Sequence, residues 1–292
     1  MRIIKFVNKL NTFYNIKKNK FDVIHPTYYD PYVIKYANNV PLVITIHDMI
    51  HEKFPEYFNK YDTTSKNKKK YLLKSNAIIT VSQKTKEDLL YFYPQIPEKK
   101  IFVIYHGNEL SSSGQINKKE NYILFIGQRN GYKNFERFIK AVAPILIRFN
   151  LRLICIGPLF TQNEYRILKQ NNITDRAIST FISESDLQDI YAKALVFVFP
   201  SLYEGFGFPI LEAFASGCPV ILSCTSCFQE IAEDAAVYFD PYSIDDMRET
   251  IEKVLLNGLL QTKLVEKGYK RIRFFSWEKT VKQTYQIYSE IL

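Results

Sequence analysis

Apolar segments of strand length alternate with helical segments between residues 122 and 222. Strands are predicted at 122–127, 151–157 and 195–199, and a helix over about 134–149 separates the first two. A helix that joins two strands carries the chain back over the sheet, so the strands pair in parallel and helices cover both faces. The segment therefore predicts a doubly wound α/β domain, and such domains bind ligands at the carboxyl ends of their strands.

The same alternation precedes residue 110. A lysine-rich helix is predicted at about 63–74, and short strands are predicted at 22–25, 42–46, 76–81 and 101–104. We expect these elements to form a further domain with a parallel sheet.

A polar stretch, Ser111–Gln115, separates the two series and is typical of a flexible linker. We therefore predict two Rossmann-like domains that face a cleft, at residues 1–110 and 119–275, with the linker at 111–118. The amphipathic segment 276–292 is expected to be a helix that packs back on the first domain.

Two glutamates flank a Gly-x-Gly turn after the strand at 195–199. Glu204 lies in the predicted loop, and Glu212 lies in the helix that Pro209 would begin, because proline suits the first helical position. Both carboxylates are expected at the carboxyl edge of the sheet. Glutamates near a helix start also serve as caps or as partners of the helix dipole, so the pattern alone leaves a structural role open.

The backbone between the two glutamates is a second feature of this turn. The N–H groups of Phe206, Gly207 and Phe208 lie where the predicted helix begins, and helix starts carry donors without an intrahelical partner. Such donors bind anions well. The turn therefore predicts an anion site beside Glu204.

A second glycine-containing loop, Gly127–Asn134, follows the strand at 122–127 and carries Arg129 and Lys133. An arginine fork and a lysine point charge together suit a diphosphate, although an ordinary surface turn is the alternative. The loop lacks the P-loop pattern, and the sequence has no GxGxxG after a strand, which argues against a dinucleotide-dependent oxidoreductase.

Three of the four histidines, His25, His47 and His106, follow predicted strands. A place at a strand end favours a chemical role for His47, whereas a lone histidine is more often structural. The sequence has no HxH or HExxH spacing, so no metal site is predicted. The pair Cys224-x-x-Cys227 has no second CxxC beside it, and we expect buried or idle thiols.

Positive charge is unevenly spread along the chain, whose formal net charge is +9. Residues 1–20 hold six basic residues and no acid, and residues 60–74 hold six lysines. Such a region is a solvated face, or it attracts an anionic membrane or a phosphate-bearing substrate. No nucleic-acid-binding signature accompanies the charge.

The sequence has no secretory signal at its start and no apolar run of about 20 residues to span a bilayer, so we expect a cytoplasmic protein.

Taken together, these motifs resemble those of the family-4 retaining glycosyltransferases of the GT-B fold. The segment SLYEGFGFPILEAFASGCPVI at 201–221 is similar to that family's donor-site signature, Gly127–Asn134 to its phosphate loop, and Val43–Asp48 to its catalytic-side strand. The resemblance covers about residues 21–292 and is strongest from 119 to 240. It implies transfer of a hexose from a nucleotide sugar to an acceptor hydroxyl, with retention of the anomeric configuration and without a metal or other cofactor.

The resemblance also implies roles for single residues. Arg129 and Lys133 would hold the donor diphosphate and stabilise it as it leaves. Glu212 would bind the nucleotide ribose, and Glu204 would contact the donor sugar. His47 would contact the sugar near the reacting centre.

Further donor-binding positions follow from the same resemblance. The segment 180–183 is similar to the one that borders the base, and the donor site would also include Gly127, Ile182, Gly205, Phe206 and Gly207.

Two segments of the first half, HPTYYDPY and TIHDMIHEKFPEYF, most resemble bacterial mannosyltransferases that build O-antigen or capsule chains. GDP-mannose is therefore the first expectation for the donor, with UDP-hexoses and dTDP-sugars as alternatives. The acceptor would be a glycan or an undecaprenyl-diphosphate-linked oligosaccharide, met at the inner face of the plasma membrane.

One departure from the family pattern concerns the first domain. The chain opens in a lysine-rich helical segment, and its first clear strand, at 22–25, resembles an internal strand of the usual domain. We therefore expect a shortened first domain. The alternative functions are a nucleotide-sugar-binding remnant without transferase activity and an epimerase that interconverts donor sugars.

Overall fold

A computed structural model describes residues 2–18, 21–26, 28–37, 40–108, 110 and 118–292. The chain divides into two compact units, unit 1 with residues 1–107 and 277–292, and unit 2 with residues 108–276. The predicted linker at 111–118 lies, except for residue 118, outside the described residues.

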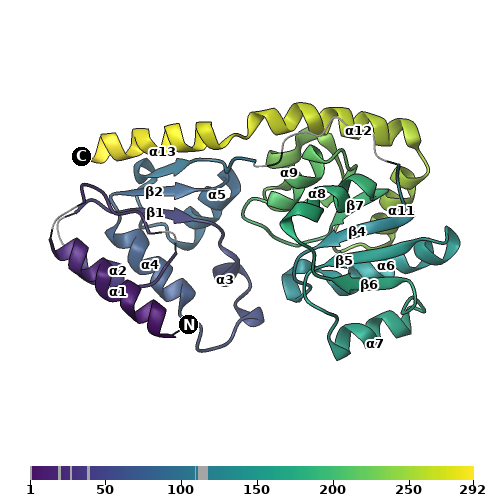
Figure 1. The fold of residues 1–292 in the computed structure, drawn as a ribbon, viewed down its shortest axis with the longest axis horizontal. Helices are drawn as coiled ribbons and strands as arrows, with labels where there is room; N and C mark the ends of the chain where they lie inside the picture. Colours follow the sequence, from purple (N-terminus) through teal and green to yellow (C-terminus); the bar gives the residue numbers. More distant parts are fainter. Residues whose placement is uncertain (1, 19–20, 27, 38–39, 109, 111–117) are drawn as a thin grey trace. The chain divides into compact units, whose positions relative to one another are not determined.

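Unit 2 is built on a six-stranded parallel sheet with the order β6-β5-β4-β7-β8-β9. The strands are β4 (Tyr122–Ile126), β5 (Arg152–Ile156), β6 (Ala177–Thr180), β7 (Val196–Phe199), β8 (Val220–Ser223) and β9 (Ala236–Phe239). The helices are α6 (Phe135–Arg148), α7 (Gln162–Gln170), α8 (Glu184–Lys193), α9 (Phe208–Ala215), α10 (Phe228–Ala232), α11 (Ile244–Leu255) and α12 (Gly258–Arg271). The predicted doubly wound domain is confirmed (Figure 1).

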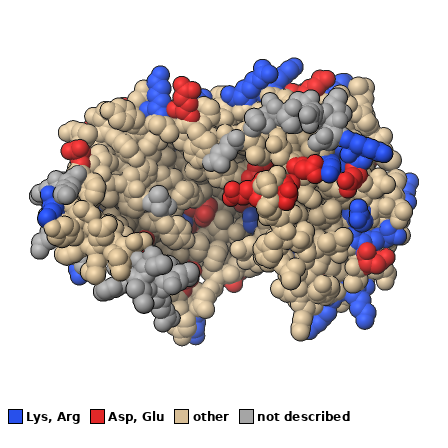
Figure 2. Space-filling model, viewed as in Figure 1, with Lys and Arg blue, Asp and Glu red and all other residues tan. Residues whose placement is uncertain are grey.

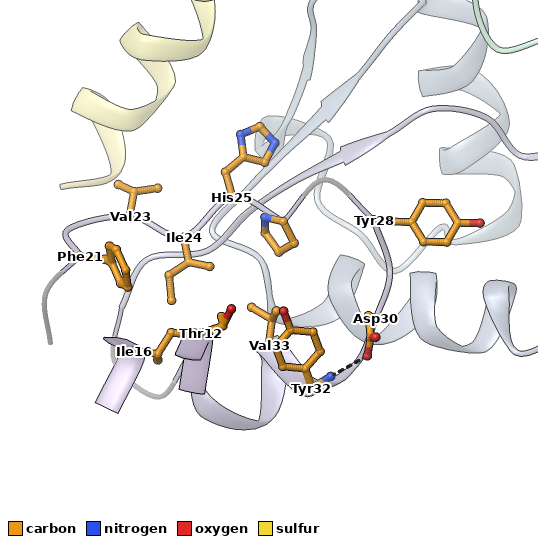
Figure 3. Close-up of a pocket in the computed structure, with 11 residues that line it drawn as sticks. Thr12, Ile16, Phe21, Val23, Ile24, His25, Tyr28, Asp30, Tyr32 and Val33 are labelled. Carbon is orange, nitrogen blue, oxygen red and sulfur yellow. Dashed lines mark hydrogen bonds between the residues drawn. The ribbon is translucent and has the colours of Figure 1, made fainter. Parts of the chain in front are cut away.

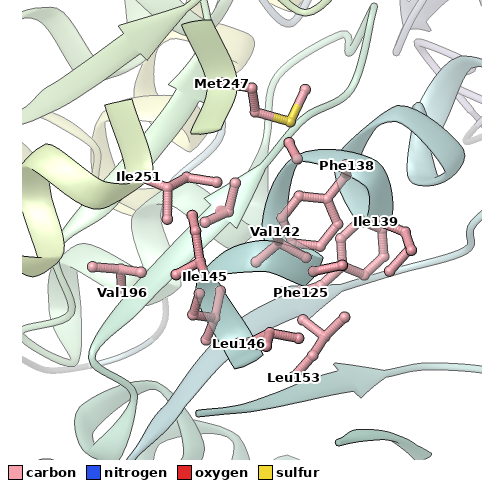
Figure 4. Packing of buried hydrophobic residues seen from close by; sticks show 14 of the residues in the cluster. Phe125, Phe138, Ile139, Val142, Ile145, Leu146, Leu153, Val196, Met247 and Ile251 are labelled. Carbon is pink, nitrogen blue, oxygen red and sulfur yellow. The ribbon is translucent and has the colours of Figure 1, made fainter. Parts of the chain in front are cut away.

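Apolar side chains bury both faces of this sheet. On one face, residues of α6 such as Phe138 and Val142 meet Phe125 of β4 and Ile251 of α11 in one buried cluster (Figure 4). On the other face, the ring of Tyr191 in α8 packs edge-on against Phe197 of β7, with ring centroids 5.4 Å apart. Burial on both faces explains why the central strands β4, β7 and β8 are almost continuously apolar instead of alternating.

Unit 1 holds a smaller parallel sheet with the order β1-β2-β3. Its strands are β1 (Val43–Ile46), β2 (Ala77–Thr80) and β3 (Ile101–Val103), and its helices are α1 (Arg2–Lys17), α2 (Tyr32–Tyr36), α3 (Ile50–Lys53), α4 (Thr64–Lys74), α5 (Gln83–Phe92) and α13 (Trp277–Ile291). The strand predicted at 22–25 is wrong as a full strand, because Ile24 forms a single parallel bridge to Leu42.

The last helix of the chain, α13, packs on the sheet of unit 1 (Figure 1). Its residue Ile287 joins the buried cluster of Val43, Ala77 and Ile79. The hydroxyl of Tyr288 is 2.6 Å from Nδ1 of His25.

The lysine-rich helix α4 contains one lysine that is not on the surface. Lys68 is fully buried, and its ammonium donates to the Glu52 carboxylate at 2.7 Å and to the Asp48 carbonyl at 2.8 Å. The expectation that all six lysines of 60–74 share a solvated face is therefore wrong for Lys68. Its contacts fix the loop that follows β1, where His47 lies.

The other five lysines of this segment, at positions 60, 66, 69, 70 and 74, are exposed. In Figure 2, Lys and Arg side chains lie singly or in small groups with acidic side chains between them, so the described part of that face has no continuous basic patch. No helix among the described residues is long and apolar enough to cross a membrane.

Replacing Lys68 by Ala tests its structural role. The variant leaves the Glu52 carboxylate buried without its cation, and we expect the free energy of unfolding to fall by about 3–5 kcal/mol. The exposed Lys70 on the same helix provides a matched control, and Lys70→Ala should change stability by about 0.5 kcal/mol or less. Equal, small effects of both substitutions in urea unfolding would contradict this interpretation.

Candidate functional site

The strand order of unit 2 defines a topological switch point between β4 and β7. From β4 the chain moves outward to β5 and β6, whereas from β7 it moves to β8 and β9 in the opposite direction. Open α/β sheets bind ligands at such a point, outside the carboxyl ends of the strands. The two loops that meet there, 127–134 after β4 and 200–207 after β7, carry the predicted site residues.

Lys133 and Glu204 join these two loops. The Lys133 ammonium lies 2.6 Å from Oε1 of Glu204, and each side chain keeps 13% of its surface exposed. The ammonium also lies 5.3 Å from the ring centroids of Tyr132 and Phe199. An ammonium has three N–H donors, so the pair leaves donors for a further anion. The sequence-based prediction that Lys133 and Glu204 belong to one site is consistent with this contact.

The loop after β4 is held by a residue that the sequence analysis did not single out. Asn134 is buried in the left-handed conformation (φ 59°), and its amide donates to the carbonyls of Pro200 and Pro241 at 3.2 and 2.8 Å. Asparagine tolerates this conformation better than most residues. An asparagine at the start of the predicted helix was the available signal for this anchor.

Arg129 is buried and makes contacts that the sequence did not reveal, and its role in holding a diphosphate stays a prediction. Its guanidinium donates to Glu164 at 2.7 Å and to the Pro158 carbonyl at 2.5 Å, and its side chain is only 2% exposed. It also lies over the ring of Phe160. Burial acts to raise the pKa of Glu164, but hydrogen bonds from Arg129 and Thr161 outweigh burial and lower that pKa. Arg129 therefore holds the loop after β5.

The start of α9 forms the other side of the switch point. Gly207 occupies the position before the helix with φ 103°, a conformation that glycine adopts freely, and a proline follows in the first turn. The predicted helix start at Pro209 is confirmed to within one residue. The positive end of the α9 dipole therefore follows the loop that carries Glu204, Gly205 and Phe206.

Glu212 is half-buried in α9 and has one hydrogen-bond donor that the sequence did not reveal. The hydroxyl of the buried Tyr191 donates to Oε2 of Glu212 at 2.8 Å. Burial raises the pKa of Glu212, and the hydrogen bond from Tyr191 partly offsets that rise. A second carboxylate oxygen remains for a ligand hydroxyl.

The remaining predicted donor positions lie at the same edge of the sheet. Gly127 follows β4 in a left-handed conformation, and its N–H donates to the Ile156 carbonyl at 2.9 Å. Ile182 lies half-buried in the loop between β6 and α8, next to the exposed ring of Phe181.

His47 lies directly after β1 in unit 1. Its backbone N–H donates to the hydroxyl of Tyr29 at 3.3 Å, and its ring stacks on that of His106 with centroids 5.8 Å apart. Burial and the neighbouring His47 lower the pKa of His106 to about 4. His106 is therefore neutral at physiological pH.

His25 lines a cavity of about 420 Å³ between α1 and the segment that leads to α2 (Figure 3). Its ring nitrogens lie 2.6 Å from the Tyr288 hydroxyl and 2.8 Å from the Thr45 hydroxyl. Both nitrogens are thus engaged within the protein. In the part of the chain that the structure describes, no three histidine, cysteine or acidic side chains gather as a metal site would require.

Two family models match the chain, "Glycosyl transferases group 1" over residues 107–271 and "Glycosyltransferase Family 4" over residues 4–111. The chain is 30% identical over 232 residues to the O-antigen chain mannosyltransferase RfbU of Salmonella typhimurium, which covers 74% of this chain and 63% of that protein. It is 31% identical over 178 residues to O-antigen chain mannosyltransferase B of Escherichia coli, which covers 58% of this chain and 46% of that protein. It therefore spans less than two thirds of the length of these two relatives.

Among solved structures, sucrose-phosphate synthase from Thermosynechococcus elongatus superimposes with a TM-score of 0.80 at 22% identity, covering 98% of this chain and 77% of that one. At this identity the likeness concerns the fold alone. It agrees with the two Rossmann-like units described above.

The substitution Glu212→Gln tests the cost of burying the Glu212 charge. The folded-state pKa of Glu212 is raised, so the stability it contributes is complete below its unfolded pKa and is lost as pH rises through its folded pKa. Gln keeps an acceptor for Tyr191 without the charge. We therefore expect the variant to be more stable than the parent chain at pH 7 and no more stable near pH 4.

Urea unfolding at the two pH values measures this difference. Glu266→Gln, at an exposed position in the interior of α12, serves as the control and should shift stability equally at both. A loss of stability by Glu212→Gln that is the same at pH 7 and pH 4 would contradict the assignment.

Proposed function

The chain belongs to the group 1 glycosyltransferases, and we propose that it transfers a hexose from a nucleotide sugar to a glycan or lipid-linked acceptor in surface polysaccharide synthesis. The Lys133–Glu204 contact at the switch point carries this proposal. It brings a cation for a diphosphate and a carboxylate for sugar hydroxyls to the place where α/β sheets bind ligands. Two of the chain's relatives are O-antigen mannosyltransferases, which makes GDP-mannose the proposed donor, with UDP- and dTDP-sugars as alternatives.

In the proposed reaction, the bond between the anomeric carbon and the diphosphate oxygen breaks, and its electron pair leaves with the diphosphate. The acceptor hydroxyl forms the new bond to that carbon on the same face and passes its proton to the departing diphosphate oxygen. Lys133 stabilises the negative charge that develops on the leaving group, because a fixed cation in a partly buried site acts more strongly than one in water. This charge supports a mechanism without a metal ion.

Other side chains would bind and orient the donor. Glu212 would accept hydrogen bonds from the ribose hydroxyls, and Glu204 would both orient Lys133 and accept from the sugar. His47 is proposed to contact the sugar at the reacting carbon. Arg129 remains a second proposed cation for the diphosphate, because Nη1 of its guanidinium has no hydrogen-bond partner among the described residues, whereas Nε and Nη2 donate to Glu164 and to the carbonyls of the loop after β5.

Calorimetric titration with GDP, UDP and dTDP and their common sugar conjugates tests the donor site. We expect saturable binding of one nucleotide class, weakened about tenfold or more in Lys133→Ala and in Glu212→Ala, since each removes a charged hydrogen-bond partner. Lys140→Ala, an exposed lysine of the neighbouring helix α6, is the matched control and should bind like the parent chain. Absence of binding to all of these ligands would overturn the proposed function.

Transfer of labelled sugar to a lipid-linked oligosaccharide separates an enzyme from a binding remnant. Donor binding without transfer would favour the remnant, whereas sugar interconversion without an acceptor would favour an epimerase. His47→Ala should lower turnover while leaving nucleotide affinity within about threefold, because the proposed contact is with the sugar.

We further propose that the chain works on the cytoplasmic side and meets its acceptor at an anionic membrane surface. The exposed lysines of 60–74 support this, since each basic residue near such a surface contributes about 1 kcal/mol. Flotation with anionic vesicles at low salt should carry the chain, and neutral vesicles or high salt should not. Equal flotation with neutral and anionic vesicles would contradict an electrostatic contact.

A further inference from the structure

Side chains at the end of β8 and directly after it bind the backbone of the loop that follows β7. That loop, residues 200–207, is neither helix nor strand, so its polar backbone groups must find other partners. Hydroxyl and thiol groups of residues 223–227 supply several of them.

The hydroxyls act at two points of the loop. Ser223 and Thr225 donate to the Ser201 carbonyl, at 2.5 and 3.4 Å. Ser226 accepts from the Glu204 N–H at 3.0 Å and donates to the carbonyl of the same residue. One hydroxyl thus binds both backbone polar groups of Glu204.

The thiol of Cys227 holds the same loop from the buried side. Cys227 is fully buried, and its sulfur lies 3.1 Å from the Phe206 carbonyl oxygen and 3.3 Å from that of Glu204. Burial raises the pKa of this thiol well above its usual value, so it stays protonated and remains a donor. Cys227 is therefore buried, as expected, but it is not idle.

We propose that Ser226 and Cys227 are positioning residues of the donor site. They fix the main chain of Glu204, so its carboxylate meets the Lys133 ammonium in the geometry that receives the diphosphate and the sugar. This inference rests on the proposed function, because it concerns the same site. It adds two residues that the sequence signature does not contain.

The backbone of Ser226 supplies a clean way to separate its hydroxyl from its conformation. Ser226 has φ 63°, in the left-handed region that a serine adopts only at a cost. Glycine adopts this conformation freely. Ser226→Gly therefore removes the hydroxyl while relieving the backbone, and the relief offsets the stability lost with the hydrogen bonds.

Calorimetric titration of the intact chain with GDP, UDP and dTDP, in parallel with urea unfolding, tests the proposal. For the nucleotide that the parent chain binds, we expect Ser226→Gly to weaken affinity about tenfold, as small misplacements of a site do, with little change in the unfolding midpoint. In a Glu204→Ala background, Ser226→Gly should cause no further loss, because Ser226 acts through Glu204. Parent-like affinity of Ser226→Gly, or an equal loss in both backgrounds, would overturn the proposal.

A pair of Cys227 variants gives an independent result if Ser226→Gly fails to fold. Cys227→Ser keeps a donor and should bind the nucleotide within about threefold of the parent chain, whereas Cys227→Ala lacks one and should bind about tenfold more weakly. Equal affinities of the two variants would contradict the role of the thiol. If the parent chain itself binds none of these nucleotides, the proposed function is overturned instead.

Discussion

The ion pair between Lys133 and Glu204 connects the two halves of the unit 2 sheet at the point where they diverge. Each partner comes from a loop that other contacts hold in place: Asn134 anchors the first loop to two carbonyls, and Ser226 and Cys227 bind the backbone of the second. The pair is therefore formed at the ends of strands whose positions the core has already set. A cation and a carboxylate held in this way need little rearrangement when a charged ligand arrives, which is the condition for effective electrostatic stabilisation.

Two cations of the loop after β4, Arg129 and Lys133, have different roles. Arg129 is buried with Glu164 and two carbonyls, and two of its guanidinium nitrogens hold a loop. Lys133 keeps part of its surface exposed and retains donors for a ligand. Lys68 in unit 1 also has a structural role, because it is fully buried and fixes the loop that carries His47. Lys133 differs from Arg129 and Lys68 in the exposure of its side chain. Residue type does not separate the two roles, since Lys68 and Lys133 are both lysines.

Local sequence patterns predicted the elements of unit 2 well, because its central strands are buried on both faces and its loops contain glycine and proline. The helix start at Pro209 follows from such a pattern, and the predicted grouping of Lys133 with Glu204 agrees with their contact. The partner of Arg129 lies 35 residues away in helix α7, and that of Lys68 lies 16 residues away, so neither burial could be predicted from local spacing. The prediction of a strand at 22–25 was wrong, because Ile24 forms a single bridge, to Leu42, and no longer ladder.

A crystal structure of the chain with its bound nucleoside diphosphate tests the central claim most directly. The account predicts phosphate oxygens within hydrogen-bond distance of the Lys133 ammonium, with the ribose hydroxyls on Glu212 and with Arg129 still paired to Glu164. A diphosphate bound elsewhere on unit 2, or held by an Arg129 that has left Glu164, would contradict it.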